Sequence, residues 1–284
     1  MKKIAFVLSS GGFLGCFQCG VMAQLEQKGI IPDVLYGTSV GAVNALGYAY
    51  CGATELLGNW TQVKSWYDAF SFDPFTLLNR RGFYNLNPLR SLLLGILSQE
   101  KVGSGEACVC YTDLIKHAVG YRHSNEEEKD PTSIQILSFL DATIASCSIP
   151  GVVAPVQGRY VDGSIIDPLP LEKAVVDGCT DIYVILNKPL ELRNYLYVKN
   201  SLIQYMMRAS YIMTHRIMMS TLLRVMIPVT TTLHVYAPSW KKIPSLRFDN
   251  KIITKLIEEG QLAEELGGYW KRHVHDYFAN TTEY

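Results

Sequence analysis

The segment between residues 34 and 45 has the sequence VLYGTSVGAVNA, and it decides the fold of this 284-residue chain. It starts as a short apolar strand, turns sharply at a serine, and continues as a helix of small residues. Gly37, Ser39 and Gly41 match Gly-x-Ser-x-Gly, the nucleophile elbow, in which a serine lies on a tight strand-to-helix turn. Glycine is needed on both sides of the serine because a Cβ would keep the strand and the helix apart. The segment therefore predicts a serine nucleophile, although a glycine-rich turn without chemistry would have the same pattern.

Strand and helix patterns alternate on both sides of this turn. Residues 4–8 predict a buried strand, 9–15 a glycine-rich loop and 16–27 a helix. Further strands are expected at 107–111, 118–122, 152–161, 181–186 and 231–236, and further helices at 53–66, 87–97, 133–145, 201–226 and 252–266. Residues 68–85 are aromatic-rich and are expected to be irregular. The alternation is typical of an α/β fold with a mostly parallel sheet, and without a repeat or a linker we expect one domain over 1–284.

Composition limits the classes of protein that the chain can belong to. It is 48% hydrophobic and 18% charged, which is typical of a globular protein, and its net charge of zero gives no reason to expect a nucleic-acid partner. The seven cysteines contain no second CxxC to complete a zinc site with Cys16 and Cys19, so we expect free, buried thiols and no metal. The apolar run 4–8 is too short for a signal peptide, and no run of about 18 apolar residues predicts a membrane span. A cytoplasmic protein is therefore expected.

The charges are distributed unevenly. Residues 188–257 hold eleven Lys and Arg against two acids, which predicts a basic face for an anionic membrane surface unless these charges are spread over solvated helices. Six of the eight methionines lie between 201 and 226. They indicate either a buried helix with Met as filler or an adaptable surface for acyl chains.

An esterase-type serine also needs an oxyanion hole. Gly11 and Gly12 precede the first helix, where backbone N–H groups favour negative charge, and the amide of Val40 follows the serine. The same loop could be a dinucleotide site, but the first glycine of that fingerprint is replaced by Ser10, and no acid ends the second strand. We therefore expect no nucleotide and no cofactor.

The base that activates the serine is harder to select. None of the six histidines has a distinctive setting. Asp162 lies at the end of a short extended run and directly before Gly163, which would hold its carboxylate at the edge of a sheet. Asp-Gly is also a common turn, so this position is not specific by itself.

Taken together, these motifs resemble the patatin-like phospholipases. The Gly-x-Ser-x-Gly around Ser39 and the Asp-Gly at Asp162 are similar to the catalytic motifs of that family, and residues 7–15 are similar to its Gly-Gly-Gly-x-Arg-Gly loop, which ends here at Gly15. Residues 142–155 and 167–170 resemble the segments on either side of the aspartate. The resemblance is strongest over 2–186, and it departs from the family at Ser10 and at Leu14, where the family has a basic residue.

The resemblance implies a three-layer α/β/α fold and a Ser–Asp dyad without a metal or a cofactor. Ser39 would be the nucleophile, Asp162 the general base, and Gly11 and Gly12 the carriers of the oxyanion amides. The expected activity is hydrolysis of phospholipids or other acyl-ester lipids, of phospholipase A or lysophospholipase type, by a protein that is cytoplasmic and visits membranes. A non-catalytic lipid-binding protein and an acyl thioesterase or transacylase are the alternatives.

Overall fold

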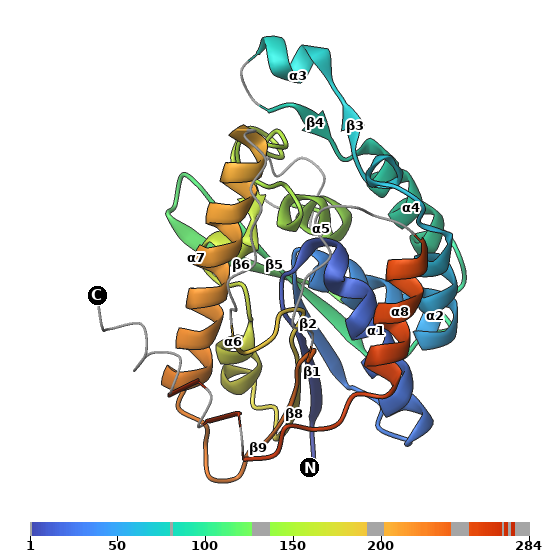
Figure 1. Cartoon of the computed structure of the whole chain (residues 1–284), viewed down its shortest axis with the longest axis vertical. Helices are drawn as coiled ribbons and strands as arrows, with labels where there is room; N and C mark the ends of the chain where they lie inside the picture. The colour runs from blue at the N-terminus through green and yellow to red at the C-terminus, as the bar shows by residue number, and fades with distance from the viewer. Residues whose placement is uncertain are drawn as a thin grey trace.

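The fold is built around a seven-stranded mixed sheet (Figure 1). The computed structural model describes residues 2–79, 82–126, 137–191, 202–239, 250–268, 270–271 and 274–275. Five strands run parallel, in the order β5 (Glu106–Asp113), β2 (Val34–Thr38), β1 (Ile4–Leu8), β8 (Asp181–Ile185) and β9 (Thr232–Tyr236). β6 (Ala118–His123) and β7 (Tyr160–Asp162) both pair antiparallel with β5.

Helices cover both faces of this sheet. One face carries α1 (Gly15–Gln27), α2 (Val40–Gln62), α4 (Asn87–Leu97), α5 (Phe139–Ser146) and α8 (Asn250–Gln261). The other carries α6 (Leu171–Val176) and α7 (Leu202–Arg224). The central strands are apolar on both faces: in β1, Phe6 and Leu8 belong to the first core, whereas Ala5 and Val7 belong to the second. The predicted three-layer α/β/α class is therefore confirmed.

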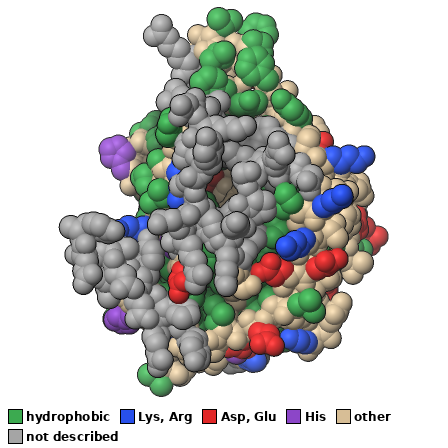
Figure 2. Space-filling view, viewed as in Figure 1, with side chains coloured by type: hydrophobic (Ala, Val, Ile, Leu, Met, Phe, Trp, Pro, Cys, Tyr) green, Lys and Arg blue, Asp and Glu red, His purple; other side chains and the backbone are tan. Residues whose placement is uncertain are grey.

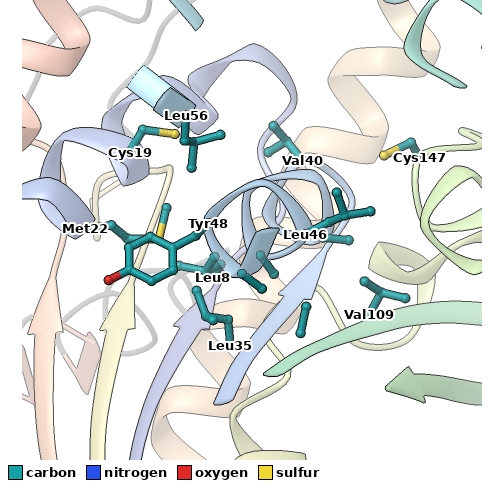
Figure 3. Close-up of a cluster of buried hydrophobic side chains, with 14 of the residues drawn as sticks. Leu8, Cys19, Met22, Leu35, Val40, Leu46, Tyr48, Leu56, Val109 and Cys147 are labelled. Carbon is teal, nitrogen blue, oxygen red and sulfur yellow. The ribbon is translucent and has the colours of Figure 1, made fainter. Parts of the chain in front are cut away.

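The larger core is formed where α1 and α2 lie on the sheet (Figure 3). Leu8, Leu35 and Val109 come from β1, β2 and β5, and they meet Met22 of α1 and Leu46 of α2. All five side chains are fully buried. This core fixes the start of α2, and with it the elbow, relative to the strands.

Helices α1 and α8 touch through their backbones although they lie at opposite ends of the chain. A Cβ at Gly20 would lie 2.2 Å from the carbonyl oxygen of Ile257, and a Cβ at Gly260 would lie 2.2 Å from that of Phe17. Only glycine fits at these two positions. The last long helix therefore holds the first one in place.

Several predicted boundaries were wrong. The helix expected at 53–66 belongs to α2, which continues from Val40 through a break at Gly52, with φ 77°, and ends at Gln62. Helix α5 begins only at Phe139, capped by Ser138, and residues 133–136 of the predicted helix lie outside the described residues. Helix α8 ends at Gln261 because the following chain crosses to β9, where the Leu266 amide donates to the Val235 carbonyl at 2.9 Å.

The described residues between 66 and 85 are more ordered than the irregular segment that was predicted at 68–85. They contain the short helices η2 (Trp66–Asp68) and α3 (Pro74–Leu78), and a two-stranded hairpin of β3 (Ser71–Phe72) and β4 (Tyr84–Asn85). The aspartate that precedes α3 caps it, since Asp73 Oδ1 accepts hydrogen bonds from the Phe75 and Thr76 amides.

The thiols lie as expected, and the methionines of α7 are divided between its two faces. All seven cysteines are free and buried, as predicted. On α7, Met218 and Met219 fill the second core, while Met213 is exposed, so this helix has one buried and one solvent face. Among the described helices, none is long and apolar enough to cross a membrane.

Candidate active site

The elbow has the strained geometry that its glycines predict. Ser39 connects β2 to α2 with φ 57° and ψ −124°, a left-handed conformation that is rare for a residue with a side chain. A Cβ at Gly37 would lie 2.1 Å from the Gly41 carbonyl oxygen, and one at Gly41 would lie 2.3 Å from the Leu8 carbonyl oxygen. The two glycines therefore let the first turn of α2 lie directly on the ends of β2 and β1.

The side chain of Asp162 contacts Ser39, although the two residues are 123 positions apart in the sequence. The Ser39 hydroxyl donates a hydrogen bond of 2.9 Å to Asp162 Oδ2, and both side chains are buried, with 8% and 2% of their surface exposed. The other carboxylate oxygen, Oδ1, accepts from the Ser164 amide at 2.8 Å. Asp162 is the last residue of β7, in agreement with its predicted position at the end of an extended run. A Cβ at the next residue, Gly163, would lie 2.4 Å from the Cys110 carbonyl oxygen, so the turn lies against β5.

Burial changes the acidity of this carboxyl group. Desolvation raises the pKa of Asp162 from 3.8 to about 6, although hydrogen bonds from Ser164 and Ser39 and the positive charge of Lys188 act in the opposite direction. The thiols of Cys110 and Cys147 face the same carboxyl group, and burial raises their pKa values well above 9, so they stay neutral. Asp162 is thus ionised at neutral pH and is a stronger base than a solvated aspartate.

The glycine loop lies beside the serine. A Cβ at Gly15 would lie 2.4 Å from Val40 Cγ2, so the loop touches the residue that follows Ser39. Gly12 and Val40 are the first residues of helices, where amides have no acceptor within the helix. Across the described part of the chain, the amides of Gly11, Gly12 and Val40 donate to no other group. Within the described residues, these three amides therefore have no hydrogen-bond acceptor of their own.

Two buried amide side chains hold this loop, and the sequence reasoning missed both. Gln18 Nε2 donates to the carbonyls of Ser9 and Ile185, each at 3.0 Å. Asn44 Nδ2 donates to the Gly15 carbonyl and to Gln18 Oε1, each at 2.9 Å, and Asn44 Oδ1 accepts from Trp60. Both residues lie in apolar helices, and a lone amide in such a helix is the signal that could have revealed them.

Residues at the end of β8 complete the surroundings of the loop. Asn187 donates to the Ser9 carbonyl at 2.9 Å, and its Cβ would be only 2.4 Å from a Cβ at Gly11. The next residue, Lys188, is buried, donates to Thr214 Oγ1 of α7, and lies 4.3 Å from the centre of the Tyr211 ring. Burial lowers the pKa of Lys188 to about 7, although the charge of Asp162 acts against this shift. Lys188 was counted in the predicted basic face, but it lies in the interior beside the site.

The other charges of the predicted basic region do not gather on one face within the described residues. Arg216 is exposed on α7, whereas Lys251 and Lys255 are exposed on α8, which covers the opposite side of the sheet. Residues 192–201 and 240–249 of that region lie outside the described residues.

Three described histidines bond to groups other than Ser39. His123 bonds to Glu106, His215 to the Pro189 carbonyl, and His234 to Asp181 and Glu265. Among the described residues, no three His, Cys, Asp or Glu side chains lie close enough together to hold a metal ion.

The two departures from the patatin motif have different surroundings. Ser10 is buried, and its amide donates to the Pro168 carbonyl at 2.9 Å, so it is part of the scaffold that holds the loop. Leu14 is partly buried against the first core. Its side chain therefore contributes packing, and it brings no charge to the loop.

Curated bacterial proteins are similar to this chain. An NTE family protein of Mycobacterium tuberculosis (strain H37Rv) is 31% identical over 201 residues, which are 65% of this chain and 49% of the relative. The protein YjjU of Escherichia coli (strain K12) is 27% identical over 211 residues, covering 67% of this chain and 53% of the relative. The chain thus spans about half the length of the curated relatives it matches.

A solved structure and a family model also match this chain. VipD from Legionella pneumophila aligns over 97% of this chain and 67% of its own, with a TM-score of 0.45 and 11% identity. The family model described as patatin-like phospholipase matches residues 6–175, which include the elbow, the glycine loop and Asp162. Since this match covers more than half of the sequence, the chain belongs to the patatin-like phospholipase family.

Proposed function

We propose that the protein is a serine acyl hydrolase of lipid esters, of phospholipase A or lysophospholipase type, that uses Ser39 and Asp162 as a catalytic dyad. The observation that carries the proposal is the 2.9 Å hydrogen bond from the Ser39 hydroxyl to a buried carboxylate. A serine attacks an ester only if a base can take its proton, and Asp162 is within hydrogen-bond distance of that proton.

The proposed reaction has two halves. Ser39 Oγ attacks the ester carbonyl carbon while its proton moves to Asp162 Oδ2, and the negative charge forming on the carbonyl oxygen is stabilised by the amides of Gly11, Gly12 and Val40. The C–O bond to the leaving alcohol then breaks, and Asp162 returns the proton to that alcohol. A water molecule next attacks the acyl-enzyme, again losing its proton to Asp162. The fatty acid leaves, and Ser39 regains its proton.

Labelling with a fluorophosphonate tests the nucleophile, because the reagent reacts only with an activated serine. We expect the wild-type protein to label and Ser39→Ala not to label, while Ser98→Ala, which alters an exposed serine at the end of α4, should label like the wild type. Asp162→Asn should slow ester hydrolysis by a factor of about 10² to 10⁴, since it removes the general base.

The two alternatives predict different results. Folded wild-type protein that binds lipid but never labels would indicate a non-catalytic lipid-binding protein. Faster turnover of an acyl thioester than of a phospholipid, in parallel assays that both depend on Ser39, would indicate a thioesterase or transacylase instead.

A further inference from the structure

The structure carries an exposed apolar projection at one end of the molecule, which we call the apolar knob. It extends from η2 through β3 to α3, and its exposed side chains are Tyr67, Phe72, Phe75, Leu77 and Leu78. Between 40% and 77% of the surface of each is exposed. Figure 2 shows hydrophobic side chains gathered at the upper tip, where Figure 1 places α3 and its hairpin. Such a cluster is unusual on a monomer surface and indicates a binding surface.

The polar groups of the knob are occupied internally. Between residues 66 and 79 the acids are Asp68 and Asp73, and the nearest cations in the sequence are Lys64 before this range and Arg80 and Arg81 after it. Asp68 Oδ2 accepts hydrogen bonds from the backbone amides of Lys64 and Ser65, at 2.6 and 2.8 Å. Asp73 caps α3 and also accepts from Thr76 Oγ1 at 2.7 Å. The large side chains that the described part of the knob exposes are therefore apolar.

The base of the knob contacts both loops of the candidate site. The amides of Phe83 and Tyr84 donate to the Val152 carbonyl, at 2.9 and 3.0 Å, in the segment that joins α5 to β7 and so to Asp162. On the other side, the ring of Phe70 lies edge-on to the ring of Phe13, which follows Gly12, with 6.2 Å between the centroids.

The direction of the knob also matters. In Figure 1 the knob extends beyond the carboxyl ends of β1 and β2. The glycine loop follows β1 at this end, and Ser39 follows β2. A planar apolar phase that received the knob would thus face the end of the sheet that carries the dyad.

We propose that the apolar knob inserts into the outer layer of a lipid assembly and holds the active-site end of the molecule against it. This inference depends on the proposed function for its partner, because an acyl hydrolase must meet substrate molecules that aggregate in water. Aromatic and leucine side chains suit the boundary between headgroups and acyl chains. Residues 66–79 of the knob contain no Lys or Arg, although Arg80 and Arg81 follow them directly in the sequence. Insertion of the apolar side chains themselves should therefore not need anionic lipid.

The test is co-sedimentation with vesicles of phosphatidylcholine alone, at low and at high salt. We expect the wild-type protein to bind at both salt concentrations. The double variant Phe75→Ser, Leu78→Ser should bind at least about tenfold more weakly, since each substitution removes a large apolar side chain. Val176→Ser, which alters an equally exposed apolar residue on α6, is the matched control and should bind like the wild type.

A second measurement reports insertion directly. All native cysteines are buried, so Leu78→Cys can be labelled selectively with an environment-sensitive fluorophore. Its emission should shift to the blue when vesicles are added, whereas a label at Val176→Cys should not respond.

Unchanged binding by the double variant, or binding that requires anionic lipid and disappears in salt, would overturn the inference. If the wild-type protein binds no vesicles but self-associates, and the double variant does not self-associate, the knob binds a second copy of the chain instead. Hydrolysis of a short soluble ester separates this test from that of the proposed function. A double variant that loses vesicle binding but hydrolyses the soluble ester normally supports the role of the knob. A wild-type protein that binds vesicles but never hydrolyses the ester contradicts only the proposed enzymatic function.

Discussion

Replacing Asp162 by Asn should make the protein more stable at neutral pH although it removes the proposed base. The buried carboxyl has a pKa of about 6 instead of 3.8, so the folded state binds its proton more tightly than the unfolded state does. Stability contributed by this group is therefore present below pH 3.8 and is lost as the pH rises through 6. At 1.36 kcal/mol per pKa unit, ionised Asp162 costs the folded state about 3 kcal/mol at pH 8.

Urea unfolding of the wild type and of Asp162→Asn at several pH values measures this cost. The Asn side chain keeps the size of Asp and can still accept from the Ser164 amide, so packing changes little. We expect the variant to be more stable by up to about 3 kcal/mol at pH 8 and by about half of that at pH 5. A variant that is less stable at pH 8, or a stability difference that does not change with pH, would refute the assignment of a desolvated carboxylate.

Two further predictions concern the elbow and the buried lysine. Gly37→Ala should destabilise the fold by about 2 kcal/mol or more in thermal or urea unfolding, because its Cβ would collide with backbone. Gly58→Ala is the control: a Cβ at this position in α2 would meet open space, so the substitution should be neutral or slightly stabilising. Lys188→Met should move the acidic limb of the pH–rate profile to higher pH, because the Lys188 charge lowers the pKa of Asp162. Lys101→Met, at an exposed position, is the control, and an acidic limb that stays in place in Lys188→Met would contradict the coupling.

The sequence was sufficient to predict the elements whose local pattern is complete. The elbow needs glycines at fixed spacing, and buried strands such as β1 and β8 are continuous apolar runs, so their positions were confirmed within a residue or two. Asp162 could be singled out as the end of a strand, but its hydrogen bond to Ser39 depends on β7 pairing with β5, which no local pattern encodes.

The features that were missed depend on contacts between distant segments. Gln18 and Asn44 are lone amides in apolar helices, but the groups that they bond are set by the fold. Lys188 likewise matters because of the neighbours that the fold gives it. The hairpin of β3 and β4 was missed because its strands have two residues each, and it is held from outside by the Val152 carbonyl. The described charges of the basic region are divided, because Lys188 is buried and the others lie on two opposite layers. The predicted basic face stays a prediction.

The glycine-to-glycine contact between α1 and α8 sets a limit on how the chain can be shortened. The family match ends at residue 175, but a recombinant fragment ending there would lack β8, the neighbour of β1, and also α8. The apolar side of the helix that follows the glycine loop would then face water. We expect the minimal folding unit to reach at least Gln261, so that residues far beyond the recognisable motifs are needed to keep the first loop in shape.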